Sequence, residues 1–391
     1  MNIEYSYDIP SNSEFTPQVE RQQPQEPRPP ALMRNGLPGV VQHPSPTMGL
    51  LMGAGQHVKP DNSPKYSIFV LDLDEATLPA TSIEINFFGH GIVPNPARPE
   101  RAAVFEKKGP GACEIDLKSG KMLRNIETSN NRRFYGHGAY APDGKYLYCT
   151  ETIVEGDYQG LIAIRDADSL EVLGEFPSHG ASPHDCQLID SGNTMVVTNG
   201  GGTLHGRAPS VTYVDVASAQ LLEKIEFDTP YINAGHLARS SRGDLAVASA
   251  FREGLVGEEA IGGISIQKQG GEMVTMTEPR ALLSKLYGET LSICMDEQRG
   301  VIAATTPLAG LLTFWDIETG QLIRHYQVKN PRGICLTLDG QYYVLSYGNP
   351  VEQMSLIAAE TLDKVNGYDL AWFGMTGSHI FNYSLPTDLR Q

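Results

Sequence analysis

Short apolar runs, separated by turns rich in Gly, Asp and Asn, recur along most of the chain and predict β-strands. In residues 138–177 the runs GAYAP, KYLYCTE, GLIAIRD and EVLGEFP each suit one strand, and Asp143-Gly144 suits a tight hairpin turn. Three aspartates recur between predicted third and fourth strands, where they are expected to form turns: Asp166, Asp215 and Asp316. No segment has the spacing of a long amphipathic helix. The pattern predicts an all-β protein.

The strand pattern repeats roughly every 48 residues, a period typical of four-stranded β-propeller blades. Each unit has an anchor position at the start of its first strand. The anchors are His90, His137, His184, His236, Ser292, Gly333 and His379. Seven anchors predict a seven-bladed β-propeller.

The two ends of the chain are predicted to share one blade. After His379 only one strand, HIFNYSL, remains, whereas the strands TMGLLMGAG, YSIFVLDLD and ATSIEIN precede the first anchor. Three N-terminal strands and one C-terminal strand would close the last blade and remove an open sheet edge. The propeller is expected to span residues 45–391. Residues 1–44 are polar and rich in Pro and Gln, which predicts a disordered or extended N-terminal arm.

Five of the ten histidines occupy the anchor position. The first strand of a propeller blade lines the central channel, so these side chains are expected to converge at one mouth of it. Crowded imidazoles repel one another when protonated, so they should be neutral and suited to Cu, Zn, Fe or Ni. We therefore predict one transition-metal ion, iron or copper, with zinc as a further candidate, on His90, His137, His184, His236 and His379. An anionic small ligand in the channel and purely structural histidines remain alternatives.

A second set of polar residues ends the predicted second strands on the same face: Glu106, Glu151, Asn199 and Arg252. Such groups can orient ligand histidines through the free ring N–H, as groups around metal sites commonly do. Glu151 is also a candidate direct ligand or general base. The alternative is a set of salt bridges at the rim, with Arg132, Arg133 or Lys107 as partners.

Charge and composition exclude several classes. A net charge of −16 argues against nucleic acid, which needs a basic face. The odd number of cysteines and the absence of a CxxC pair argue against a disulfide framework, and Cys294 and Cys335 are expected to be buried, with metal ligation as the alternative. No apolar run is long enough to span a membrane. The N-terminus has no basic start followed by an apolar core, so the chain as it stands is predicted to be cytoplasmic.

Four stretches carry a family resemblance: FFGHGIVPNPARPERAAVFEKKGPG, NRRFYGHGAYAPDGKYLYCTE, GASPHDCQLIDSGNTMVVTNGG and GHLARSSRGDLAVA. They resemble the bacterial family of domain of unknown function 1513, within the broader group of seven-bladed YVTN-repeat and WD40-like propellers, over about residues 48–386. Members typically carry an export signal and often accompany iron-uptake genes. The resemblance therefore implies a periplasmic role related to iron or copper.

Three functions stay open at this point. The first is a metal-binding propeller that serves in metal handling or in a metal-dependent redox step. The second is a non-catalytic protein-interaction scaffold with structural histidines. The third is a lactonase-like hydrolase, since some YVTN-type propellers hydrolyse sugar lactones, and here the histidines and Glu151 would act as acid and base. The sequence names no protein partner and does not decide whether the chain is an enzyme.

Overall fold

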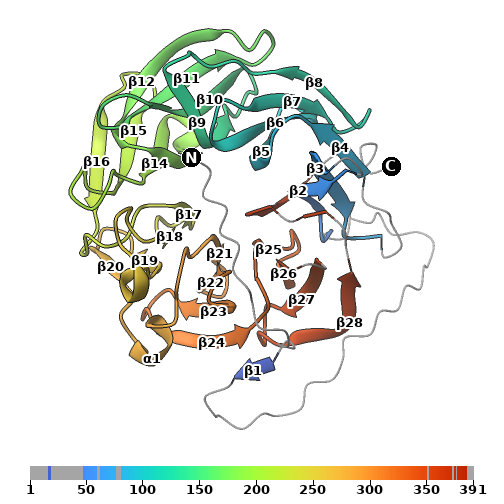
Figure 1. Cartoon of the computed structure of the whole chain (residues 1–391), viewed down its shortest axis with the longest axis vertical. Helices are drawn as coiled ribbons and strands as arrows, with labels where there is room; N and C mark the ends of the chain where they lie inside the picture. The colour runs from blue at the N-terminus through green and yellow to red at the C-terminus, as the bar shows by residue number, and fades with distance from the viewer. Residues whose placement is uncertain are drawn as a thin grey trace, which may run out of the picture.

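A computed structural model describes residues 16–18, 47–59, 62–75, 81–349, 352–371, 374–375 and 377–384. The sheets stand around a common axis, as in a β-propeller (Figure 1). The one α-helix among these residues, α1 (Arg280–Leu283), has four residues, and two 3-10 turns cover Asp190–Gly192 and Gly257–Glu259. The all-β prediction is confirmed.

Within the described residues the strands form six sheets. Four of them have four strands each. The first is β13 (Pro183–Ile189), β14 (Thr194–Asn199), β15 (Ser210–Asp215) and β16 (Leu221–Glu226). The second is β17 (His236–Arg239), β18 (Leu245–Ser249), β19 (Gly263–Gln267) and β20 (Met273–Thr275). The third is β25 (Ile334–Leu336), β26 (Tyr342–Tyr347), β27 (Gln353–Ala358) and β28 (Lys364–Ala371). The fourth is β29 (Ile380–Tyr383), β2 (Leu50–Val58), β3 (Pro64–Asp72) and β4 (Thr81–Ile85).

The other two sheets are larger. One has five strands: β1 (Thr16–Gln18), β24 (Leu322–Gln327), β23 (Leu311–Asp316), β22 (Val301–Thr306) and β21 (Ser292–Asp296). The last has eight: β12 (Val172–Ala181), β11 (Gln159–Asp166), β10 (Tyr146–Ile153), β9 (Arg132–Tyr140), β6 (Arg98–Gly109), β7 (Ala112–Asp116), β8 (Lys121–Asn125) and β5 (Gly89–Asn95), which pairs with β6. The described chain thus has five separate blades and one continuous eight-stranded sheet. The prediction of seven blades is wrong.

The long strand β6 explains the discrepancy. Beyond its pairing with β5 and β7, β6 continues to β9, where Lys107 lies opposite Tyr135 and Gly109 opposite Phe134. Phe105 and Phe134 pack beneath this join, with ring centroids 5.9 Å apart. A repeat period locates the strands but does not reveal a hydrogen bond between neighbouring units, because such pairing depends on how closely two backbones approach in space.

The predicted closure of the ring is confirmed. β29 pairs antiparallel with β2, from Leu50 opposite Tyr383 to Gly53 opposite Ile380. The two ends of the described propeller are therefore held in one sheet, and the inner edge of β2 is covered.

The predicted aspartate turns are also confirmed. Asp166 accepts a hydrogen bond from the backbone N–H of Ser169 at 2.7 Å. Asp215 and Asp316 do the same three residues on, also at 2.7 Å. A side chain that mimics a backbone acceptor in this way stabilises the tight turn between a third and a fourth strand.

The core lies between the faces of neighbouring sheets. One cluster, for example, joins Phe105, Phe134, Leu147 and Cys149, all fully buried. Burying one large apolar side chain stabilises a fold by about 1.5–3 kcal/mol. This packing holds the inner strands rigidly, and with them the residues that face the central axis.

Some expectations concern residues beyond this description. Of the predicted arm, residues 1–44, only β1 is described, and it pairs antiparallel with β24, with Thr16 opposite Gln327.

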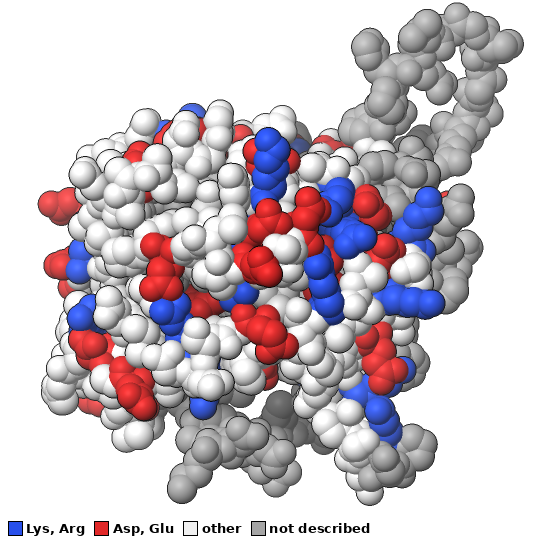
Figure 2. All heavy atoms as spheres, turned by 90° about the horizontal axis from the view of Figure 1, so that it is seen from above, with Lys and Arg blue, Asp and Glu red and all other residues white. Residues whose placement is uncertain are grey.

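The five cysteines are free. Among the described residues, no helix has the length and apolar character that crossing a membrane requires. On the face shown in Figure 2, Lys and Arg lie among Asp and Glu and do not gather into a basic patch.

Candidate metal centre

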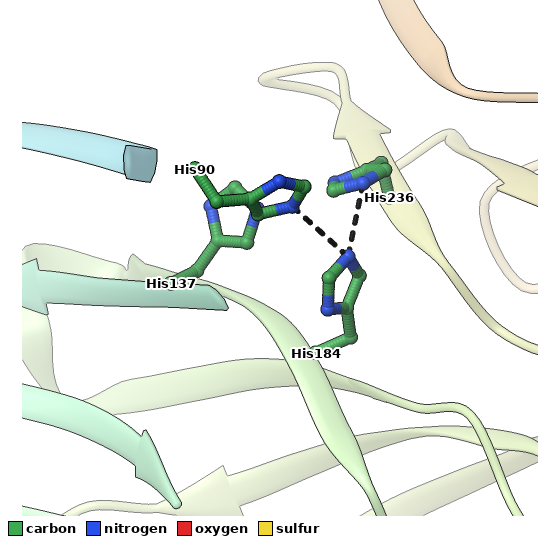
Figure 3. A group of neighbouring side chains, drawn as sticks. All are labelled: His90, His137, His184 and His236. Carbon is green, nitrogen blue, oxygen red and sulfur yellow. Dashed lines mark hydrogen bonds between the residues drawn. The ribbon is translucent and has the colours of Figure 1, made fainter. Parts of the chain in front are cut away.

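The five anchor histidines come together around the central axis. His90 belongs to β5, His137 to β9, His184 to β13 and His236 to β17, and His379 directly precedes β29. Each is buried, with 4–7% of its surface exposed. Figure 3 shows the first four rings pointing toward one another from different strands. The prediction that these histidines converge is confirmed.

Three ring nitrogens meet around one point. His184 Nε2 lies 2.9 Å from His236 Nε2 and 3.4 Å from His90 Nε2, the two dashed lines in Figure 3. His184 Nδ1 faces the carbonyl oxygen of Tyr135 at 2.6 Å and must donate its proton there. The Nε2 atom of His184 therefore carries the lone pair. One lone pair serves one good donor, so two further Nε2 atoms around it are better explained by a shared ligand.

These separations fit a common metal ion. Two nitrogens that bind one ion at about 2.0–2.1 Å lie about 2.9 Å apart at a right angle and about 3.4 Å apart at a tetrahedral angle. One ligand atom from each of His90, His137, His184 and His236 lies within 4.8 Å of all the others. These four histidines can hold a metal ion.

Two ring nitrogens in the cluster have no protein partner. His137 Nε2 and His379 Nε2 are buried and make no hydrogen bond. The His379 ring lies 3.9 Å from that of His236 and 4.6 Å from that of His90, between ring centroids. Its Nδ1 faces Ser292 Oγ at 3.3 Å. A buried polar atom without a partner costs about 1–3 kcal/mol, and a ligand held by the cluster could satisfy both atoms.

The glycines of the GHG phrases make room for the rings. A Cβ on Gly136 would lie 2.8 Å from His90 Cδ2 and 3.0 Å from His184 Cε1, and Gly136 has a φ of +125°. A Cβ on Gly91 would lie 2.3 Å from the Gly136 carbonyl oxygen and 3.0 Å from His137 Nδ1. Side chains at either position would push the imidazoles apart. In the GHG phrases, the glycines thus leave the room that the neighbouring imidazole rings need.

Asp185 is the site residue that the sequence analysis missed. Its carboxylate lies between two rings, with Oδ1 3.6 Å from His137 Nδ1 and Oδ2 3.8 Å from His236 Nδ1. The backbone N–H groups of Cys186 and Leu237 donate to it and fix its orientation. A carboxylate on the Nδ1 side favours a proton there and leaves Nε2 free as a ligand atom. The available signal was the acidic residue directly after His184 in the phrase PHD.

The electrostatics keep the rings neutral. Burial lowers the pKa of His90, His184, His236 and His379 well below 6.5, and the neighbouring histidines lower these pKa values further. Burial also lowers the pKa of His137, although Asp185 opposes the shift. Desolvation outweighs the mutual repulsion that the sequence suggested as the cause.

A cation at the mouth adds to this effect. Lys107 lies near the end of β6. Its positive charge is close enough to lower the pKa of all five histidines. Its Nζ donates to Glu289 Oε1 at 3.0 Å, and the two residues come from distant parts of the chain. This ion pair lies near the histidine mouth of the channel.

The four residues predicted around the histidines make other contacts. Glu106 accepts the backbone N–H of Gly111 at 2.8 Å and shapes the turn after β6. The amide of Asn199 bonds to Thr212 and Ser178 within its own part of the fold. Arg252 donates to backbone carbonyls of the loop 202–207. No contact of these three with a histidine ring is seen among the described residues.

Glu151 belongs to a buried ion cluster inside the eight-stranded sheet. It is 1% exposed, accepts from Arg165 at 2.9 Å and from Thr128 at 2.9 Å, and lies 3.8 Å from Arg132. These contacts engage both carboxylate oxygens. The contacts of Glu151 are therefore structural. Among the described residues, no histidine contacts its carboxylate.

The remaining histidines lie apart from the cluster, as far as the structure describes them. His179 bonds through Nε2 to the carbonyl oxygen of Ala219 at 3.0 Å, His57 packs edge-on against Phe69, and His205 is exposed. His325 lies in β24 opposite Gln18. His43 is outside the described residues.

Sequence comparison assigns the chain to a family. Residues 83–373 match the family described as "Protein of unknown function (DUF1513)", and the chain belongs to that family. The predicted family membership is confirmed. A search among curated proteins finds no match.

Similar solved structures agree with the fold. Hydrazine synthase of Kuenenia stuttgartiensis superimposes with a TM-score of 0.60 at 14% identity, over 84% of this chain and 100% of that one. A chain of a mitotic checkpoint complex gives a TM-score of 0.53 at 14% identity, over 72% of this chain and 77% of that one. At such low identity these similarities support the propeller fold alone.

Proposed function

We propose that this chain binds one transition-metal ion through His90, His137, His184 and His236, with His379 beside them, and serves in metal handling or in a metal-dependent redox step. One observation carries the proposal: in a group of buried rings, His184 Nε2 lies 2.9 Å from His236 Nε2 and 3.4 Å from His90 Nε2. An all-imidazole donor set suits copper, iron or zinc. The family resemblance favours iron or copper among these.

The alternative is a protein-interaction scaffold with structural histidines. In that case each buried ring nitrogen should have a protein partner, because an unsatisfied one is costly. The partnerless Nε2 atoms of His137 and His379 favour the metal. The neutral state of all five rings supports it as well, since a metal ion binds the unprotonated imidazole.

Metal analysis of protein purified without an affinity tag tests the proposal. We expect about one ion per chain after loading with iron, copper or zinc in turn. The double variant His137→Ala/His184→Ala should lose stoichiometric metal and keep its fold. The matched control His57→Ala/His205→Ala also removes two histidines, both outside the cluster, and should retain the ion.

Two outcomes would decide for the scaffold. One is a native protein that holds no metal after loading with each candidate ion. The other is a double variant that unfolds, as judged by circular dichroism and thermal melting, while the control melts normally. In that case the histidine ring supports the fold.

A further inference from the structure

The two sides of the histidine group differ in charge. The inner strands of the repeats run in one direction, so residues before the anchor positions lie on one side of the histidines and residues after them on the other. Two cavities, of about 270 and 430 Å³, lie on the later side, since residues such as Gly138, Cys186 and Ile293 line them. Among the described residues of these linings, Asp185 is the one acidic group and no Lys or Arg occurs. This side therefore favours a cation.

The earlier side carries cationic groups. Lys107 lies opposite Tyr135, which precedes the anchor of its own strand and whose carbonyl oxygen faces the His184 ring at 2.6 Å. The charge of Lys107 is close enough to lower the pKa of all five histidines. Arg332 directly precedes the anchor Gly333. Two cations thus stand before the anchor positions, on the side away from the cavities.

One carboxylate reaches across the axis on this side. Glu289 lies three residues before the anchor Ser292, and its Oε1 accepts a hydrogen bond from Lys107 Nζ at 3.0 Å. Figure 1 shows β6, which contains Lys107, and β21, which follows Glu289, on opposite sides of the central axis. Burial lowers the pKa of Arg332, and the nearby Glu289 carboxylate opposes this shift. A single carboxylate is thus near two cations at the mouth of the channel.

The positive charge at this mouth exceeds what Glu289 neutralises. Lys107 has three N–H donors, and Glu289 is its one hydrogen-bond partner among the described residues. Arg332 uses its Nε–H for a backbone carbonyl. A further pair of opposite charges, Lys108 and Glu253, adds no net charge. A metal ion on neutral imidazoles would add more positive charge. The side chains of Lys107 and Glu289 are 29% and 32% exposed, so a small solute can reach them.

We propose that this mouth binds a small carboxylate that faces the metal ion and replaces Glu289 as the partner of Lys107. The inference rests on the proposed metal site, because the ion supplies part of the attraction. A carboxylate gains charge-assisted hydrogen bonds from an ammonium group, which are stronger than those of a neutral ligand. Glu289 presents the same chemical group to Lys107 when no ligand is bound. It is therefore a competitor within the fold, and the ligand must displace it.

Two matched probes test the class of ligand on the native protein. Acetate carries the same carboxylate group as Glu289, and acetamide has nearly its shape and size without the charge. Copper-loaded protein is first shown to hold one Cu²⁺ per chain by metal analysis. Each probe is then titrated at neutral pH, and the change in the electron paramagnetic resonance spectrum of Cu²⁺ is followed. We expect acetate to bind saturably and about tenfold more tightly than acetamide.

Two variants should change the affinity for acetate in opposite directions. Glu289→Gln removes the competitor and should tighten binding about tenfold, whereas Lys107→Gln removes the cation and should weaken it about tenfold. A variant that merely disturbed the mouth would weaken binding in both cases. The control Lys65→Gln removes a lysine whose ion pair, 3.4 Å from Glu84, involves no residue of this mouth, and it should bind as the native protein. All three variants should keep their copper.

The double variant separates direct replacement from a general effect of charge. If Glu289 competes through Lys107, then adding Glu289→Gln to Lys107→Gln should leave the affinity for acetate nearly unchanged. The same gain in both backgrounds would overturn the inference. Equal affinity for the two probes, no gain in Glu289→Gln, or no loss in Lys107→Gln would overturn it as well. A native protein without copper fails at the metal site itself, and this is seen before any probe is added.

Discussion

The buried neutral histidines should make the metal-free protein sensitive to acid. In the unfolded chain a histidine titrates near pH 6.5, whereas burial holds the pKa of His90, His184, His236 and His379 well below that value in the fold. Below pH 6.5 the unfolded state therefore takes up more protons than the folded state. Stability from this source is complete above pH 6.5 and declines as the pH falls toward the folded-state pKa.

The size of the effect follows from linkage. A histidine that stays neutral in the fold loses about 1.4 kcal/mol of stabilisation between pH 7.5 and pH 5.5. Four such residues lose about 5 kcal/mol together. Whole domains are stable by about 5–15 kcal/mol, so the metal-free protein should approach its unfolding threshold at pH 5.5.

Urea unfolding of chelator-treated protein at the two pH values measures this loss. Removing one member, as in His184→Ala, lowers stability at both pH values but should reduce the difference between them by about 1.4 kcal/mol. The control His205→Ala removes an exposed histidine and should leave the difference unchanged. A native pH difference below about 1 kcal/mol, or the same difference in His184→Ala, would refute the reasoning that these rings are held neutral by burial.

Three further predictions address the supports of the site. Asp185→Asn should weaken metal binding by about 10–100-fold in calorimetric titration with little change in melting temperature, and an unchanged affinity would show that the carboxylate does not position the rings. Gly136→Ala should lower both metal content and stability, because its Cβ would meet two imidazoles, whereas Gly254→Ala, also at positive φ but with open space around it, should lower stability alone. Glu151→Gln should destabilise the fold by about 3–5 kcal/mol in urea unfolding, since it leaves Arg165 buried without its charged partner, and should leave metal content unchanged. Loss of metal from folded Glu151→Gln would instead place that residue in the site.

The histidine cluster is the part of the site that local sequence reasoning reaches. Strand periodicity locates each inner strand, and the repeat shows that five histidines share one repeat position. In a propeller those two facts suffice to bring the side chains to one axis. Asp185 escaped this reasoning, although it is adjacent to His184, because whether a carboxylate turns toward a neighbouring ring depends on the strand it faces. The backbone N–H of Leu237, which holds Asp185 in place, lies in another blade.

The amino-acid sequence alone determined the strands, the aspartate turns, the closure of β29 on β2 and the positions of the five histidines, because each follows from local alternation, turn chemistry or the repeat. The tertiary structure decided what lies opposite each of them. It joined β6 to β9 into one eight-stranded sheet, paired Glu151 with Arg165 inside that sheet, and left a cavity bordered by His137, His236 and His379. These features depend on distances between segments far apart in the chain, and a pattern along one dimension does not contain such distances.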